Sequence, residues 1–240
     1  MSNCTYKTLF PLSSKYDSNW IRKHSLGENV LYNLETLSHV LEFNTRMKVL
    51  DLGCGKAISA IFLAREFGLK VWAIDPKINP SDNFNRIKDM GVEDLVVPLK
   101  LDARKLPFPK EYFDIILAVD SFMYYGTDIE YTRYVSSFLK KGGKIGIVDI
   151  CQNFGNNSNG NGINKKKLNF LHSLEWWFEL FQTSEILNVE IAEIVPENSF
   201  IRREYVKDVL TSNREDIIAE ELSIDTDENI NVFRMVAVKY

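Results

Sequence analysis

The sequence predicts an α/β fold in which helices cover both faces of a mostly parallel β-sheet. Three observations support this. Short apolar runs alternate with stretches of helical spacing, a glycine turn follows the first run, and each run carries an aspartate at or next to its end. The runs expected to form buried parallel strands are 47–52, 69–74, 96–101, 113–119 and 144–148.

The glycine turn has the sequence Gly53-Cys54-Gly55 and precedes a helix expected over 57–67. Glycine reaches backbone angles that other residues avoid, and it lets a ligand approach the main chain closely, so the turn indicates a nucleoside-cofactor site. A dinucleotide site would carry a third glycine where this chain has Ile58. An acid such as Asp75 would bind the ribose hydroxyls of either a dinucleotide or S-adenosylmethionine. Cys54 is interpreted as a small turn residue.

The aspartates of the five runs favour one cofactor class over the other. Ligands of open α/β sheets bind at the carboxyl ends of the strands, so these acids are expected around a single crevice. They would repel a pyrophosphate, whereas S-adenosylmethionine carries a sulfonium and an ammonium and has no phosphate. S-adenosylmethionine is therefore favoured over NAD or FAD. The aspartates concerned are Asp51, Asp75, Asp102, Asp120 and Asp149.

Ordered motifs over about residues 45–150 resemble those of class I S-adenosylmethionine-dependent methyltransferases. They are 49–56, 71–76, Asp102-Ala103 with Leu106-Pro107-Phe108, 113–120, and 139–143. Two further segments, 9–17 and 120–126, look like a bacterial small-molecule branch whose members are often labelled as similar to cyclopropane-fatty-acid synthases. That label does not establish a lipid substrate. The resemblance implies a Rossmann-like sheet of seven strands with an antiparallel last strand, and helices on both faces.

The resemblance also implies roles for individual residues. Tyr16 with Asp17 would lie near the methionine end of the cofactor, and Asp102 with Ala103 would read the adenine. The full expected set of cofactor-binding residues is Tyr16, Asp51, Gly53, Cys54, Gly55, Asp75, Pro76, Asp102, Ala103, Asp120 and Ser121. Tyr124 and Tyr125 follow the fourth strand, where methyl group and acceptor meet in related enzymes, and can offer a hydroxyl or an aromatic wall.

The expected reaction is one in-line transfer of the methyl group to a small acceptor, for which alignment supplies much of the acceleration. No motif for a nucleophilic residue is present. A hydroxyl or protonated amine acceptor would require a base. The catalytic candidates are Tyr125 and His172, with His24 a candidate by residue type only. A nicotinamide oxidoreductase and a non-catalytic cofactor-binding module of the same fold are the alternatives.

The amino-acid composition limits the partners and the location that can be expected for the protein. A formal net charge of −4 gives no electrostatic footprint for nucleic acid. The sequence has no apolar leader and no long apolar run, so we expect a cytoplasmic protein without integral membrane association. Three cysteines without C-x-x-C spacing and three scattered histidines predict no metal site. The oligomeric state cannot be predicted.

We expect 1–240 to form one domain, made of an arm and helix (1–45), a cofactor-binding core (46–150) and a C-terminal part (151–240). Within these, the pattern predicts a loosely packed aromatic arm over 1–24 and a low-complexity loop, 153–167, which is either a surface insertion or a lid. The other expected elements are helices over 27–43, from Ser81 to 90, from Thr127 or Asp128 to 139, from Ser173 onward and within 204–222, and strands over 188–195 and 230–239.

Overall fold

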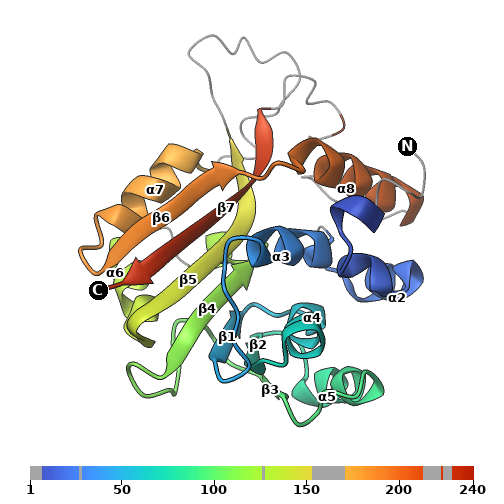
Figure 1. The fold of residues 1–240 in the computed structure, drawn as a ribbon, viewed down its shortest axis with the longest axis horizontal. Coiled ribbons are helices and arrows are strands. Elements are labelled where there is room, and N and C mark those ends of the chain that lie inside the picture. The colour runs from blue at the N-terminus through green and yellow to red at the C-terminus, as the bar shows by residue number, and fades with distance from the viewer. Residues whose placement is uncertain (1–6, 27–28, 126–127, 153–170, 213–222, 224–228) are drawn as a thin grey trace.

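The computed structural model describes residues 7–26, 29–125, 128–152, 171–212, 223 and 229–240. Its centre is a seven-stranded sheet with the order β3-β2-β1-β4-β5-β7-β6 (Figure 1). Strand β7 runs antiparallel to both neighbours, whereas the remaining neighbouring pairs are parallel. The strands are β1 Lys48–Leu52, β2 Lys70–Ile74, β3 Val96–Leu99, β4 Phe113–Val119, β5 Leu139–Gln152, β6 Leu187–Ile194 and β7 Ile230–Lys239. The predicted mixed sheet with an antiparallel last strand is confirmed.

Helices cover both faces of this sheet. Apolar residues of α3, α4, α5 and α8 share one core with the sheet, and those of α6 and α7 share the other, in agreement with the two groups of helices in Figure 1. The helices are α2 Ser18–His24, α3 Val30–Ser38, α4 Ile58–Phe67, α5 Pro80–Asp89, α6 Ile129–Ser136, α7 Leu174–Gln182 and α8 Asn198–Ser212, with 3-10 turns η1 Ser13–Lys15 and η2 Phe122–Tyr124.

The apolar runs form central strands because both faces of each strand are buried. Successive side chains of a strand point to opposite faces. Val49 and Ile115 accordingly pack in the core under α4, while Leu50 and Ile116 pack in the core under α6 and α7. A continuous apolar run is thus required at β1 and β4, as the sequence indicated.

Most helix ends lie at the capping residues predicted from the sequence, with one exception. Ser173 caps α7 and Asp128 caps α6, each accepting a hydrogen bond from a main-chain N–H of the first turn. Gly68 ends α4 in the left-handed conformation, as expected. The prediction that Ser81 caps α5 is wrong, because the Asn79 side chain accepts from the Ser81 N–H and Pro80 occupies the first turn.

Strand β5 is longer than predicted at both ends. The pair Gly142-Gly143 was expected to separate a helix from a strand beginning at 144, yet both glycines lie within β5. The pairing of β4 with β5 shifts register at this point, so the glycines form a bulge. A Cβ on Gly143 would lie 2.9 Å from the Asp114 carbonyl oxygen, which explains why glycine is required there.

Three other expected boundaries also move. The helix predicted over 27–43 is described as α3 Val30–Ser38, because Asn29 caps it by accepting from two main-chain N–H groups. Strand β3 ends at Leu99 rather than at 101. Helix α8 begins before 204, because Asn198 at its start bonds to the main chain and side chain of β7. Residues 213–222 and the loop 153–167 lie outside the described residues.

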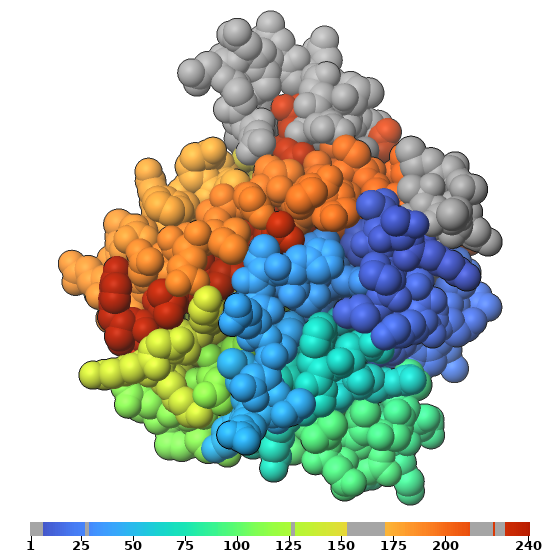
Figure 2. Space-filling model, viewed as in Figure 1, coloured from blue at the N-terminus to red at the C-terminus, as the bar shows by residue number. Residues whose placement is uncertain are grey.

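The N-terminal arm, residues 7–26, is well packed rather than loose. The buried Glu35 carboxylate of α3 accepts from the main-chain N–H groups of Leu12 and Ser13 and from the Ser13 hydroxyl. Phe10 is fully buried and packs on Phe200 of α8. Figure 2 shows the arm in dark blue between the cyan α4 and the orange C-terminal part. Within the described residues, no helix has the length and apolar character needed to cross a membrane.

Candidate functional site

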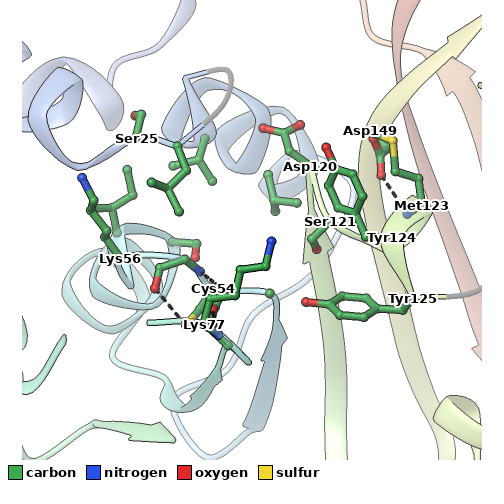
Figure 3. Close-up of a pocket in the computed structure, with 18 of the residues that line it drawn as sticks. Ser25, Cys54, Lys56, Lys77, Asp120, Ser121, Met123, Tyr124, Tyr125 and Asp149 are labelled. Carbon is green, nitrogen blue, oxygen red and sulfur yellow. Dashed lines mark hydrogen bonds between the residues drawn. The ribbon is translucent and has the colours of Figure 1, made fainter. Parts of the chain in front are cut away.

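A cavity of about 710 Å³ opens where the carboxyl ends of β1, β2, β4 and β5 meet (Figure 3). This is the edge at which ligands of open α/β sheets bind, and the volume is ordinary for a small-molecule site. Its two sides differ in composition. The β1–β2 side consists of Gly53, Gly55, Asp75, Pro76 and Lys77, and the β4–β5 side of Asp120, Met123, Tyr124, Asp149 and Tyr205.

The glycine turn on the β1–β2 side is held by its main-chain N–H groups. Those of Gly53 and Cys54 donate to the carbonyl oxygen of Ile74 at 2.9 and 3.0 Å. That of Gly55 donates to Asp75 Oδ2 at 3.2 Å. The N–H groups of these three residues are therefore engaged by the end of β2 and are not arranged to bind a phosphate.

Close packing requires a glycine at 53, and the positive φ angles of 72° and 52° favour glycine at both 53 and 55. A Cβ on Gly53 would lie 2.5 Å from the hydroxyl oxygen of Tyr125 and 2.7 Å from Ser121 Cβ. A Cβ on Gly55 would lie 3.0 Å from Leu26 Cδ1 of the arm. Three side chains of the protein itself, those of Tyr125, Ser121 and Leu26, thus lie against the turn, and the cavity lies beside them. A ligand is therefore not the only group that approaches these glycines closely.

Asp75 is fixed as a hydrogen-bond acceptor at the mouth of the cavity. Its Oδ1 accepts from the main-chain N–H groups of Lys77 and Ile78 at 2.7 and 2.9 Å, and its Oδ2 accepts from Gly55. A carboxylate with this many N–H donors is held in one orientation, and Oδ2, which accepts only one of these bonds, has a further lone pair for a ligand hydroxyl. This is the geometry expected of a residue that binds ribose.

Asp51 does not line the cavity, contrary to its expected place on the rim. It lies within β1, is 1% exposed and accepts a hydrogen bond from Ser59 Oγ of α4 at 2.5 Å. Burial raises the pKa of Asp51 to about 7, with Asp75 adding to the rise and Ser59 opposing it. Asp51 thus supports the turn from beneath.

The β4–β5 side combines carboxylates with aromatic residues. Asp120 follows β4 with a φ of 51°, and its Oδ1 accepts from Asn33 Nδ2 of α3 at 2.9 Å. Asp149 of β5 is fully buried, and its Oδ1 accepts from its neighbour's N–H, that of Ile150, at 2.9 Å. Figure 3 shows Asp120 and Asp149 on the same side as Tyr124, with Lys77 reaching toward the centre of the cavity.

Ser121 and Tyr125 connect the two sides. Ser121 Oγ donates to the Leu52 carbonyl oxygen at 2.6 Å, which ties the end of β4 to the end of β1. Tyr125 is 8% exposed and lines the cavity. Burial, followed by the nearby acids, raises the pKa of the Tyr125 hydroxyl, so the group stays protonated and acts as a donor.

Besides Asp51, four of the expected site residues are not among those that line the cavity. Tyr16 packs against Phe62 and donates to Glu66 at 3.2 Å, and Asp102 accepts from the N–H of Arg104 next to the buried Ala103. His172 stacks on Trp176 with ring centroids 3.6 Å apart, and burial lowers its pKa. The roles expected for these residues stay predictions.

Several lining residues were not predicted. Ser25 and Leu26 come from the arm, Lys56 from the turn, Arg104 from the segment after β3 and Tyr205 from α8. His24 of the arm, a catalytic candidate by residue type only, also lines the cavity. His24 contacts the Trp20 carbonyl oxygen through Nδ1 at 2.8 Å, and burial lowers its pKa. Lys56 lies within the motif 49–56 and Arg104 follows Asp102-Ala103, whereas Ser25, Leu26 and Tyr205 reach the cavity through tertiary packing.

Comparison with known proteins agrees with this geometry. Residues 49–143, which include β1, β2, the glycine turn and β4, match the protein family described as "Methyltransferase domain". This stretch of the chain is therefore similar to methyltransferase domains. The family resemblance predicted from the ordered motifs is thereby confirmed.

Two curated proteins and one solved structure illustrate the range of proteins that this chain resembles. Methyltransferase GfsG of Streptomyces halstedii is 32% identical over 48% of this chain and 42% of its own length. Phosphoethanolamine N-methyltransferase 1 of Zea mays is 26% identical over 80% of this chain and 38% of its own length. The chain thus spans less than half the length of either relative. The [4+2]-cyclase SpnF has the same fold, with a TM-score of 0.71, 16% identity and coverage of 98% of this chain and 93% of its own.

Proposed function

We propose that the protein binds S-adenosylmethionine in the cavity and transfers its methyl group to a small-molecule acceptor. The observation that carries the proposal is the placement of Asp75. Its carboxylate stands at the end of β2, is fixed by three main-chain N–H groups and adjoins the glycine turn. A phosphate-free nucleoside with free ribose hydroxyls matches these acceptors.

The residues of the β1–β2 side fit this cofactor. Asp75 would bind the ribose hydroxyls, and Gly53, Gly55 and Pro76 would line the path of the nucleoside. When bound, the cofactor supplies a methyl group on a sulfonium, which a nucleophilic acceptor can take directly. Asp102 with Ala103 at the adenine and Tyr16 at the methionine end remain part of the proposal on the strength of the family resemblance.

The β4–β5 side is proposed to hold the acceptor. Asp149 and Tyr124 line the cavity opposite the glycine turn, where an acceptor would face the cofactor (Figure 3). Asp120 and Ser121, which also line the cavity, stay proposed contacts of the cofactor. Holding two reactants in line lowers the activation free energy by about 7–11 kcal/mol, so the protein need not form a covalent bond with either reactant. Tyr125 stays protonated, so it serves as a hydrogen-bond donor and wall rather than as a base. The maize relative acts on phosphoethanolamine, which is an acceptor of the proposed size class.

A nicotinamide oxidoreductase is disfavoured by two features of the turn. The N–H groups of Gly53, Cys54 and Gly55 are bonded to β2 and its following aspartate, so they are not available to a pyrophosphate. Asp75 beside the turn would repel such a group. A different reaction on the same fold is the second candidate, because SpnF shares the fold and is a cyclase.

Calorimetric titration tests cofactor binding directly. The protein should bind S-adenosylmethionine and S-adenosylhomocysteine and give no heat with NADH. Incubation with S-adenosylmethionine and a library of small amines, phenols and carboxylates should then give one product heavier by a methylene group in mass spectrometry. Tight NADH binding without S-adenosylmethionine binding would contradict the proposal. Cofactor binding with no turnover across the library would support the binding-module alternative.

The proposal extends to partners and place of action. A net charge of −4 disfavours an RNA or DNA acceptor, so no methylation of nucleic acid is expected in a parallel assay. Small diffusible acceptors and nucleoside cofactors are found in the cytoplasm. We therefore propose that the protein acts in the cytoplasm. Fractionation of cells that produce the tagged protein would check this.

A further inference from the structure

The turn that carries the proposed function is conformationally strained. Three alternating residues, Gly53, Gly55 and Ala57, have φ angles of 72°, 52° and 63°. The first two are glycines, which adopt this region freely, but Ala57 carries a Cβ that disfavours it. Strained residues of this kind persist only where the surrounding structure holds them in place.

Helix α5 supplies two side chains that hold the strained turn. Asn83 is 2% exposed, and its Nδ2 donates to the carbonyl oxygen of Gly55 at 3.0 Å. Arg86, one helical turn further, donates from Nε to the carbonyl oxygen of Lys56 at 3.1 Å. Its Nη2 also donates to Asn83 Oδ1, which fixes the orientation of the Asn83 amide. The two carbonyls immediately before Ala57 are thus both bound from α5.

The turn is therefore held from two directions. The end of β2 binds the N–H groups of Gly53, Cys54 and Gly55, while α5 binds the carbonyl groups of Gly55 and Lys56. Helix α5 is itself anchored independently, because Asn79 caps its start and Ile87 is fully buried in the core. A change at Asn83 can thus be separated from a change in the stability of α5.

We infer that Asn83 and Arg86 are positioning residues for the cofactor: they hold the peptide units of Gly55 and Lys56 so that the Gly55 N–H stays on Asp75. Neither side chain is among those that line the cavity, so both act through the turn and not by contact with a ligand. The inference rests on the proposed function, since the effect of these two residues is measured as a change in affinity for S-adenosylmethionine.

The main test is Asn83→Asp, which keeps the shape of the side chain and replaces the donor NH₂ by an oxygen facing the Gly55 carbonyl. Calorimetry should show affinity for S-adenosylmethionine weakened by about tenfold or more relative to the native protein. Hydrogen exchange of the ligand-free protein should show faster exchange at Gly55 and Ala57. Arg86→Gln, at a partly exposed position, should give the same two changes with smaller magnitude. This variant provides the test if Asn83→Asp does not fold.

Two further variants separate positioning from general stability. Asn79→Ala removes the cap of the same helix without touching the turn, so it should lower the melting temperature and leave the affinity unchanged. Adding Ala57→Gly to Asn83→Asp removes the Cβ that causes the strain, and it should recover part of the lost affinity. Native-like affinity and exchange in a folded Asn83→Asp protein would overturn the inference, as would an equal loss in Asn79→Ala. A native protein that binds no S-adenosylmethionine would instead refute the proposed function.

Discussion

The β1–β2 side of the cavity comes from a single strand–helix–strand unit, whereas the β4–β5 side is assembled from parts of the chain that are far apart in sequence. Residues within 53–59 and 75–77 supply the first side, and main-chain hydrogen bonds fix most of the geometry of its glycine turn. The second side combines residues that follow β4, one from β5 and Tyr205 from α8. A local, backbone-bonded site suits a ligand common to a whole family, and an assembled site can change its acceptor without disturbing the cofactor.

The largest expected effect is at the turn itself. Gly53→Val should weaken binding of S-adenosylmethionine by more than about 100-fold, or roughly 2.8 kcal/mol, because its side chain would overlap Tyr125 and Ser121 and displace the turn. Isothermal titration calorimetry measures this. Gly91→Ala is the matched control: φ is 68° there and a Cβ would meet nothing within 4 Å. It should cost about 1 kcal/mol of folding stability and leave binding intact. Equal losses in both variants would contradict the role of close packing.

Removal of the Asp75 carboxylate should have the next largest effect. Asp75→Ala should weaken cofactor binding by about 1.5–3 kcal/mol, the range for hydrogen bonds to a charged group. Surface plasmon resonance or calorimetry can follow it. Asp82→Ala, which removes an exposed acid from α5, controls for the change in net charge and should bind normally. Unchanged affinity in a folded Asp75→Ala protein would refute the ribose role.

Asp51 should make folding stability depend on pH. Because its pKa is raised to about 7 in the folded protein and is about 3.9 when unfolded, its ionisation disfavours the fold. The folding stability that the protonated Asp51 contributes is fully present below pH 4 and is lost as the pH rises toward 7. The free energy of unfolding should fall by at most about 1.4 kcal/mol per pH unit for this reason. Asp51→Asn, which cannot ionise, should flatten this decline in denaturant titrations between pH 5 and 8. A decline as steep as in the native protein would show that Asp51 is ionised without penalty.

The smallest effect is expected on the side that faces the acceptor. Tyr125→Phe keeps the ring in the wall of the cavity and removes only the hydroxyl, which lies next to Gly53, so cofactor affinity should change by less than about 1 kcal/mol. Once an acceptor is identified, steady-state kinetics should place any further loss in kcat or in the KM of the acceptor. Tyr124→Phe, at an exposed ring, is the comparison. A large loss of cofactor affinity in Tyr125→Phe would assign this tyrosine to the β1–β2 side.

The same contrast explains what could be predicted from the sequence. Gly53, Gly55 and Asp75, which were predicted to bind the cofactor, line the cavity because a strand, a turn and the next strand fix their positions locally. His172 and Tyr16 depend on how distant elements pack, and each packs on neighbouring aromatic residues away from the lining. The arm residues and Tyr205 carry no local pattern that points to a site.

The fold shows the same division. Apolar runs located β1, β2 and β4 because these strands are buried on both faces. The bulge at Gly142-Gly143 was not predicted, because two adjacent glycines are as typical of a break between a helix and a strand as of a bulge within a strand. Asn79 and Ser81 are both good capping residues, and only the direction in which the chain enters α5 decides between them.

Strand β7 has a consequence for how the chain is made. It is the last of the strands to be synthesised, yet it lies between β5 and β6 and pairs with both. Until residues 230–239 leave the ribosome, β5 has an open edge and β6 has no partner in the sheet. Nascent chains would therefore expose this edge to other proteins, and a premature stop codon shortly before β7 should yield a product that aggregates or is degraded.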